Sequence, residues 1–303
     1  MRALAAFVMG GWLSAVLVVA GMTVLALLLP PLTSPLAYAG GGGLALVTLR
    51  RGPGAGAGVL TGAAVLLGLA SQLLAGSMVP GLAAGLVLWV PVWLAAGVLR
   101  TTIAWPLTLL AVVAMGIALI ALMHLALGDP AGWWAARMQA LAERLPDQGL
   151  ALAEVVPALS RWMTAVMAAA LAVGVVASLL LGRWWQSLLY NPGGFGREFR
   201  ALQMGRGYGL VVLLLVLAGA LLGGAPGRLS ADLALVAAVP LLFQGIAVVH
   251  GLVVARGMHR GWLVALYVLL LVAEPHAAML ATLLGWLDTG LRFRGRMPDA
   301  GAS

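Results

Sequence analysis

The stretch VPGLAAGLVLWVPVWLAAGVLRTTIAWPLTLLAVVAMGIALIALMHLAL, residues 79–127, carries one charged side chain, Arg100, between two long apolar runs. Each run reaches the roughly 20 residues that a helix needs to cross the hydrocarbon core of a bilayer. Neither run shows the strict alternation of a lipid-facing β-strand, which disfavours a porin-like barrel. This stretch therefore predicts two membrane-spanning helices joined by a short, positively charged turn.

The same alternation of apolar runs and arginine-bearing gaps extends over the rest of the chain. Further spans are predicted at residues 7–29, 36–49, 55–75, 162–181, 207–222 and 233–255. The last apolar stretch, 261–287, is interrupted at Glu274-Pro275, so it is either a re-entrant hairpin, which we favour, or one more span. The predicted fold is an all-α, polytopic transmembrane helix bundle of about eight spans plus this broken segment, with residues 1–303 forming a single domain.

The composition agrees with a membrane protein and excludes several kinds of chemistry. The chain is 63% hydrophobic and 9% charged, whereas soluble domains are about 25% charged. It has no cysteine, which excludes disulfides, thiol nucleophiles and Cys-ligated metal sites. All 17 basic residues are arginine, and the absence of lysine excludes a Walker A ATPase and Schiff-base catalysis.

The arginines also predict the topology. Bacterial membrane proteins keep an excess of arginine on the cytoplasmic side, so the net charge of +8 is interpreted as this signal rather than as nucleic-acid binding. With the N-terminus in the cytoplasm, cytoplasmic gaps hold nine arginines, and external gaps hold four beside five acidic residues. We therefore predict a multi-pass protein of the bacterial inner membrane. Its polar tail, 288–303, carries Arg292, Arg294 and Arg296 and is cytoplasmic only if the last stretch forms a hairpin.

Two longer connections are predicted outside the bilayer. The external one, 128–161, begins with Asp129-Pro130, which is typical of a helix N-terminus. Trp134, Met138, Leu141 and Leu145 then share one face, which indicates an amphipathic helix at the membrane surface.

The cytoplasmic connection, 182–206, reads GRWWQSLLYNPGGFGREFRALQMGR. Its first part carries aromatic rings suited to the headgroup level, and a strong turn signal follows. Beyond the turn, Phe195 and Phe199 share one helical face. The segment is interpreted either as an anchor for two spans or as a docking surface for a partner. The residues of that surface would be Trp184, Trp185, Tyr190, Asn191, Pro192, Gly193, Gly194, Phe195, Arg197, Phe199 and Arg200.

Three pieces of the sequence carry a family resemblance: MRALAAFVM (1–9), RWWQSLLYNPGGFGREF (183–199) and GWLDTGLRFRGR (285–296). They resemble the YybS-like family of bacterial polytopic membrane proteins, in its gammaproteobacterial form, a family without an assigned activity. The last motif usually has an acidic residue where this chain has Arg292. The apolar pattern more distantly resembles the substrate-binding integral subunits of energy-coupling-factor vitamin transporters, which implies a helical, ligand-binding membrane domain.

Few polar side chains inside the apolar runs are candidates for a site. Glu274 is an acid within an apolar stretch, beside His276, and such groups usually face a cavity or a partner. The alternative is that Glu274 lies at the tip of the re-entrant turn and reaches the interface. Gln244 is a second candidate for a path between helices. No histidine pair has metal-ligand spacing and no catalytic arrangement is present, so we predict no enzyme activity, no metal site and no cofactor.

Two functions follow from this pattern. The leading hypothesis is a transporter-like or small-molecule-binding membrane subunit, with Glu274, His276 and Gln244 in contact with the ligand. The alternative is a membrane scaffold or regulatory interaction protein that acts through the cytoplasmic segment Trp184–Arg206. The expected partners are the lipid bilayer and either a small-molecule ligand or a cytoplasmic or membrane protein, but not nucleic acid.

Overall fold

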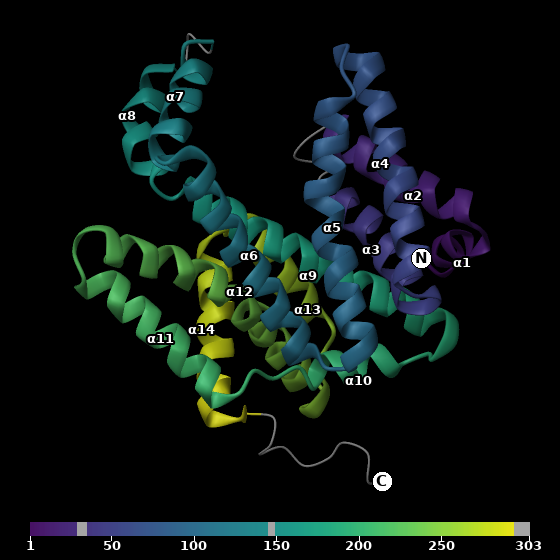
Figure 1. Cartoon of the computed structure of the whole chain (residues 1–303). Coiled ribbons are helices and arrows are strands. Elements are labelled where there is room, and N and C mark those ends of the chain that lie inside the picture. The colour runs from purple at the N-terminus through teal and green to yellow at the C-terminus, as the bar shows by residue number, and fades with distance from the viewer. Residues whose placement is uncertain (29–34, 145–148, 294–303) are drawn as a thin grey trace. The chain divides into compact units, whose positions relative to one another are not determined.

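The computed structural model describes residues 1–28, 35–144 and 149–293, and these ranges are helical almost throughout (Figure 1). The expected all-α class is confirmed. In chain order the described helices are α1 (Arg2–Gly10), α2 (Trp12–Leu28), α3 (Pro35–Arg51), α4 (Pro53–Ala75), α5 (Val79–Thr102), α6 (Trp105–Leu127), α7 (Pro130–Ala142), α8 (Gly149–Ser160), α9 (Met163–Tyr190), α10 (Gly194–Arg200), α11 (Arg206–Leu221), α12 (Gly224–Ala255), α13 (Gly261–Val272) and α14 (His276–Leu291).

Five of these helices, α4, α5, α6, α9 and α12, are long and apolar enough to cross a membrane. The helices α2, α11 and α13 are apolar but shorter. Long apolar helices satisfy every backbone hydrogen bond internally, which is what a bilayer demands. The chain is accordingly an integral membrane protein, while the number of crossings and their direction stay predictions.

Contacts between residues divide the chain into two compact units, which we describe separately. Unit 1 comprises Met1–Val112 and Val173–Leu202, and unit 2 comprises Val113–Ala172 and Gln203–Ser303. The chain passes from one unit to the other three times: within α6, within α9 and between Leu202 and Gln203.

Unit 1 is built on a close approach between α3 and the second half of α9. The four glycines 40–43 of α3 are all buried. A Cβ on Gly41 would lie 2.3 Å from the hydroxyl oxygen of Ser178, and one on Gly182 would lie 2.7 Å from the Cβ of Ala45. Small residues at such positions let two membrane helices pack backbone against backbone.

Unit 2 is organised around α12, the most buried of the five long apolar helices. A Cβ on Gly245 would lie 1.8 Å from the carbonyl oxygen of Ala281, and one on Gly285 would lie 1.9 Å from that of Leu241. The order of these contacts shows that α14 runs antiparallel to α12 where they cross. Helix α11 packs on the other part of α12, and α7 packs against α8.

Several helix boundaries differ from the predicted ones, for identifiable reasons. The first apolar run is divided at Gly11, whose backbone is extended, so it forms α1 and α2. Residues 182–190 were predicted as loop but continue α9 to Tyr190. Arg183 ends the apolar run without ending the helix, because the first helix-breaking residues come only at Asn191-Pro192.

The connection 128–161, predicted to be external, contains more helix than predicted. Leu145 of its predicted apolar face lies outside the described residues. Helix α7 begins at Pro130, as expected, although the Asp129 side chain makes no capping hydrogen bond. A second helix, α8, follows it. The indole nitrogen of Trp134 in α7 donates to the hydroxyl of Thr164 in α9 at 3.0 Å, which ties this connection to the start of α9.

The last apolar stretch is broken where the sequence indicates, because α13 ends at Val272 and α14 begins at His276. The guanidinium of Arg206 donates to the carbonyl oxygen of Gly290 at 3.1 Å. The end of α14 therefore lies beside the start of α11 (Figure 1). A hairpin would bring these two ends together, whereas a further crossing would make α14 antiparallel to α12, as it is where they cross. The hairpin and the further span therefore both stay predictions. The tail residues 294–303, with Arg294 and Arg296, lie outside the described residues.

Candidate functional site

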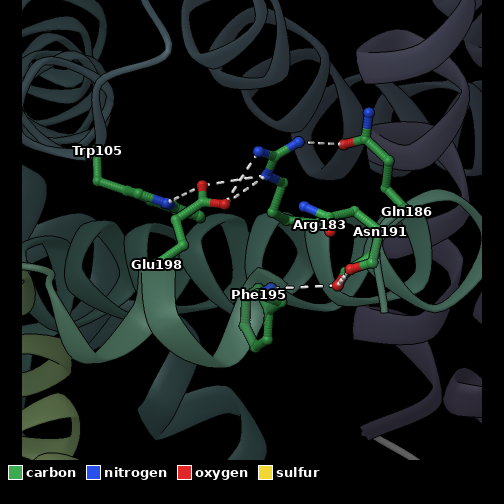
Figure 2. Close-up of polar contacts among 7 residues, drawn as sticks. Trp105, Arg183, Gln186, Asn191, Phe195 and Glu198 are labelled. Atoms are coloured by element: carbon green, nitrogen blue, oxygen red, sulfur yellow. Dashed lines mark hydrogen bonds and ion pairs between the residues drawn. The ribbon is translucent and has the colours of Figure 1, made fainter. Parts of the chain in front are cut away.

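The segment 182–206, predicted to be cytoplasmic, folds back on itself through a tight turn. The Ser187 hydroxyl donates to the carbonyl oxygen of Asn191 at 2.6 Å and accepts from the backbone N–H of Phe195 at 3.1 Å. Gly193 has a φ of 81°, in the left-handed region that favours glycine. Figure 2 shows this turn directing α10 back toward the body of α9. One serine thus fixes both sides of the turn.

The apolar face predicted beyond the turn packs inward. The rings of Phe195 and Phe199 are stacked, with centroids 5.8 Å apart and an interplanar angle of 15°. Phe199 and Leu202 are buried, whereas Arg197 is exposed. The short helix α10 is therefore held to the protein by its aromatic side and presents its other side outward.

Glu198 on α10 is the centre of a polar cluster. Its carboxylate accepts the indole N–H of Trp105 at 2.6 Å and the Nε–H of Arg183 at 2.9 and 3.1 Å. The Nη2 of Arg183 forms an ion pair with the same carboxylate at 2.9 Å (Figure 2). The pair is partly shielded, with exposed fractions of 29% for Arg183 and 26% for Glu198. Two-pronged, partly buried pairs of this kind are stronger than exposed ones.

A cavity of about 280 Å³ adjoins this cluster. Four charged or polar residues line it, Arg100, Arg183, Gln186 and Glu198, which we call its polar wall. Three apolar residues, Leu49, Leu99 and Ile103, also line it, and we call them its apolar wall. Arg183 also donates to the Gln186 side-chain oxygen at 2.7 Å, and Arg100 donates to the carbonyl oxygen of Leu49. All of these residues belong to unit 1, at the ends of α3 and α5, before the first turn of α6, and on α9 and α10.

The charges around the cavity do not cancel. Residues 1–112 and 173–202 contain seven arginines and one acid, Glu198. Glu198 is bound by Arg183, while the one hydrogen bond of Arg100 to a described residue is to a backbone carbonyl. The lining side chains thus carry two positive charges and one negative. Arg50, the residue after Leu49, places its guanidinium 4.2 Å over the ring of Tyr190.

Gln244, a predicted ligand contact, lies inside unit 2. It is fully buried. Its amide oxygen accepts the backbone N–H of Met204 at 2.7 Å, and its amide nitrogen donates to the carboxylate of Asp288 at 2.8 Å. Asp288 also accepts the backbone N–H of Phe293 at 3.0 Å. In this structure Gln244 joins α12, α14 and the segment before α11.

Glu274 and His276, the other predicted ligand contacts, are exposed at the break between α13 and α14. Gln244 instead contacts Asp288. Asp288 lies about three turns, or roughly 18 Å, beyond His276 along α14. The structure therefore does not bring the three predicted residues together.

The residues predicted to form a docking surface are divided by burial. Trp185 is fully buried, and its indole nitrogen has no hydrogen-bond partner among the described residues. Trp184 is half-buried. The two rings are therefore less exposed than a placement among lipid headgroups predicts. The exposed members are Tyr190, Asn191, Pro192, Gly193 and Arg197, while Gly194, Phe195, Phe199 and Arg200 are buried or half-buried.

Sequence reasoning did not single out Trp105, Arg100, Arg183, Gln186 or Glu198 as a site. One signal was present: Glu198 is the single acid in a strongly basic segment, 182–206. An acid at such a place needs a charged partner, and Arg183 is that partner.

Comparison of the chain with protein-family models, with curated proteins and with solved structures gave no match in any of the three. The YybS-like resemblance and the more distant one to vitamin-transporter subunits accordingly stay predictions. The function is argued from the site alone.

Proposed function

We propose that the protein is a membrane-embedded small-molecule-binding protein of the transporter-like type, and that its ligand occupies the cavity beside Glu198. The carrying observation is a cavity with one apolar wall and one wall of fixed charged and polar groups. Binding sites for small molecules combine these two features, at volumes from about 300 Å³ upward. The cavity is at the lower end of that range, which suits a compact ligand or the head of a larger one.

The polar groups of the cavity are held in place by hydrogen bonds, which favours the cavity over the helix break at Glu274 as the ligand site. Arg183 is held by Glu198 and Gln186, so its guanidinium is positioned before any ligand arrives. Preorganised groups lose little entropy on binding. Glu274 and His276, in contrast, are exposed. They remain candidates only for a role at the membrane interface.

A binding screen tests the proposal. Purified protein would be heated with compounds of differing charge, and a true ligand present at 100 times its dissociation constant stabilises the folded state by about 2.7 kcal/mol. The substitution Gln186→Trp fills the cavity and is expected to abolish this stabilisation. Gln72→Trp, the same change at an exposed position of α4 away from the cavity, is the matched control. Ligands that stabilise both variants equally would show that the cavity is not the site.

The second candidate function is a membrane interaction protein. It is favoured by the exposed turn of residues 190–193 and the exposed Arg197, which are backed by packed aromatic rings. A photo-crosslinker placed at Asn191 tests it in intact cells. Capture of one defined protein, absent with the crosslinker at exposed Leu73 of α4, would support this function.

A further inference from the structure

We propose that the cavity beside Glu198 takes a phosphate-class anion, either the headgroup of an anionic phospholipid or a soluble phosphate monoester. This inference rests on the proposed function and names the chemical class of its ligand. It assigns the ligand-facing charge to Arg100 and the orienting role to Arg183.

Charge balance is the first argument. Among the described residues one carboxylate lines the cavity, that of Glu198. It already accepts three N–H groups from Arg183 and Trp105. It has little capacity left to bind a cation. Arg100 retains its positive charge, since its one described hydrogen bond goes to the uncharged carbonyl of Leu49. A phosphodiester headgroup, with one negative charge, would bring the lining to neutrality. A phosphate monoester carries about −1.5 to −2 at pH 7 and would more than offset the excess positive charge.

The type of cation is the second argument. A guanidinium presents a planar fork of N–H donors that matches phosphate oxygens two at a time. Arg100 donates from Nη1 to Leu49, and its other N–H groups have no hydrogen bond to the described residues. Gln186 accepts from Arg183 through its oxygen, so its amide nitrogen is a further donor. Figure 2 shows that nitrogen on the side of Gln186 away from Arg183.

The apolar wall is the third argument. Ile103 is 79% exposed directly after the arginine-bearing end of α5, and it lines the cavity together with Leu49 and Leu99. A phosphate attached to a glycerol or a comparable carbon skeleton would meet both walls at once. Basic pockets at the cytoplasmic ends of membrane helices are the usual places where anionic lipid headgroups bind.

Native mass spectrometry of the purified full chain tests the inference. Phosphatidylglycerol, phosphatidylcholine and glycerol 3-phosphate would be added separately. We expect retention of phosphatidylglycerol or glycerol 3-phosphate, but not of phosphatidylcholine. Arg100→Gln should lower this retention about fivefold, the effect of about one arginine near an anionic group. Arg197→Gln removes the same charge from the exposed side of α10 and should have a much smaller effect.

A second variant guards against misfolding of Arg100→Gln. Gln186→Glu keeps an oxygen acceptor for Arg183 and adds one negative charge to the cavity, so it should also reduce retention while the melting temperature is unchanged or higher. Phosphatidylglycerol that remains bound in excess glycerol 3-phosphate identifies the lipid as the ligand. Displacement by glycerol 3-phosphate identifies the soluble ester.

The inference is overturned if Arg100→Gln and Arg197→Gln weaken retention equally, which indicates only general surface charge, or if neither anion is retained. The proposed function still holds in that case if uncharged or cationic compounds stabilise the unsubstituted protein but do not stabilise Gln186→Trp. It fails as well when no compound of any charge class depends on the cavity.

Discussion

The crossing of α12 and α14 yields the sharpest quantitative prediction. An ideal Cβ on Gly285 would lie 1.9 Å from the carbonyl oxygen of Leu241, whereas ordinary van der Waals contact begins at 3.4 Å. Gly285→Ala therefore requires about 1.5 Å of separation along this line, the difference between the two distances. The obstructing atom belongs to a helix backbone, so no side-chain rotation can relieve the clash.

This separation also affects the buried polar contacts of the crossing. The Gln244 amide lies 2.8 Å from the Asp288 carboxylate, and a shift of this size takes the pair beyond hydrogen-bond range. Overpacking costs about 1–3 kcal/mol, and a buried polar group left unpaired costs about 1–3 kcal/mol. The expected loss of stability is about 2–6 kcal/mol, which lowers the melting temperature by roughly 4–12 °C.

Gly290→Ala is the matched control, because it makes the same change on the same helix where a Cβ would meet nothing within 4 Å. Thermal unfolding of both variants in detergent, followed by intrinsic fluorescence and by loss of the monodisperse gel-filtration peak, measures the difference. If Gly285→Ala melts within about 1 °C of the unsubstituted protein, the close crossing is wrong. The interpretation of Gln244 as a buried contact between helices, which depends on that crossing, is then wrong as well.

Three further predictions follow from individual contacts. Glu198→Gln should lower stability by about 1–3 kcal/mol, since Arg183 loses its counter-charge, and thermal unfolding should show no comparable loss for Arg197→Gln. Trp134→Phe should cost about 1 kcal/mol through the lost hydrogen bond to Thr164, measured in the same assay; an unchanged melting temperature would mean that α7 is not tied to α9. A reporter that fluoresces only in the cytoplasm should fluoresce when it is fused after Ser303, since Arg206 contacts Gly290. The hairpin is refuted if that fusion is dark while the same reporter inserted at Gly205 fluoresces.

The sequence was a good guide to the helices and a poor guide to their partners. The apolar runs predicted the main helices because lipid permits hardly any other spanning structure. The break at Glu274-Pro275 was visible because proline interrupts a helix locally. The extension of α9 past Arg183 was missed because hydropathy marks where the apolar run ends, whereas the helix ends only at the turn of residues 191–193.

The candidate site was missed because its contacts are distant in sequence. Trp105 and Glu198 are 93 residues apart, and Gln244 and Asp288 are 44 residues apart. Such pairs depend on how each helix is rotated and where helices cross, which glycines such as Gly285 decide. Sequence reasoning ranked Gln244 by its depth in an apolar run, but depth does not tell a ligand contact from a buried packing contact.

The pattern of residues in segment 182–206 is explained by one geometric requirement, that Glu198 must return to Arg183. Gly182 fixes α9 against α3, since its Cβ position is 2.8 Å from the carbonyl oxygen of Gly42. Arg183 is the next residue, so its backbone is placed by that contact. The turn at Gly193 then reverses the chain, and Glu198 returns to Arg183 after 15 residues.

Each of these residue types is needed for that return. A side chain at Gly182 would push α9 away, a non-glycine at Gly193 would strain the left-handed turn, and a neutral residue at Glu198 would leave Arg183 partly shielded without a counter-charge. The polar wall of the cavity is thus set by backbone contacts rather than by flexible side chains alone. For this reason we expect the cavity to keep its form without a ligand, and a ligand to raise the melting temperature without changing the far-ultraviolet circular dichroism spectrum.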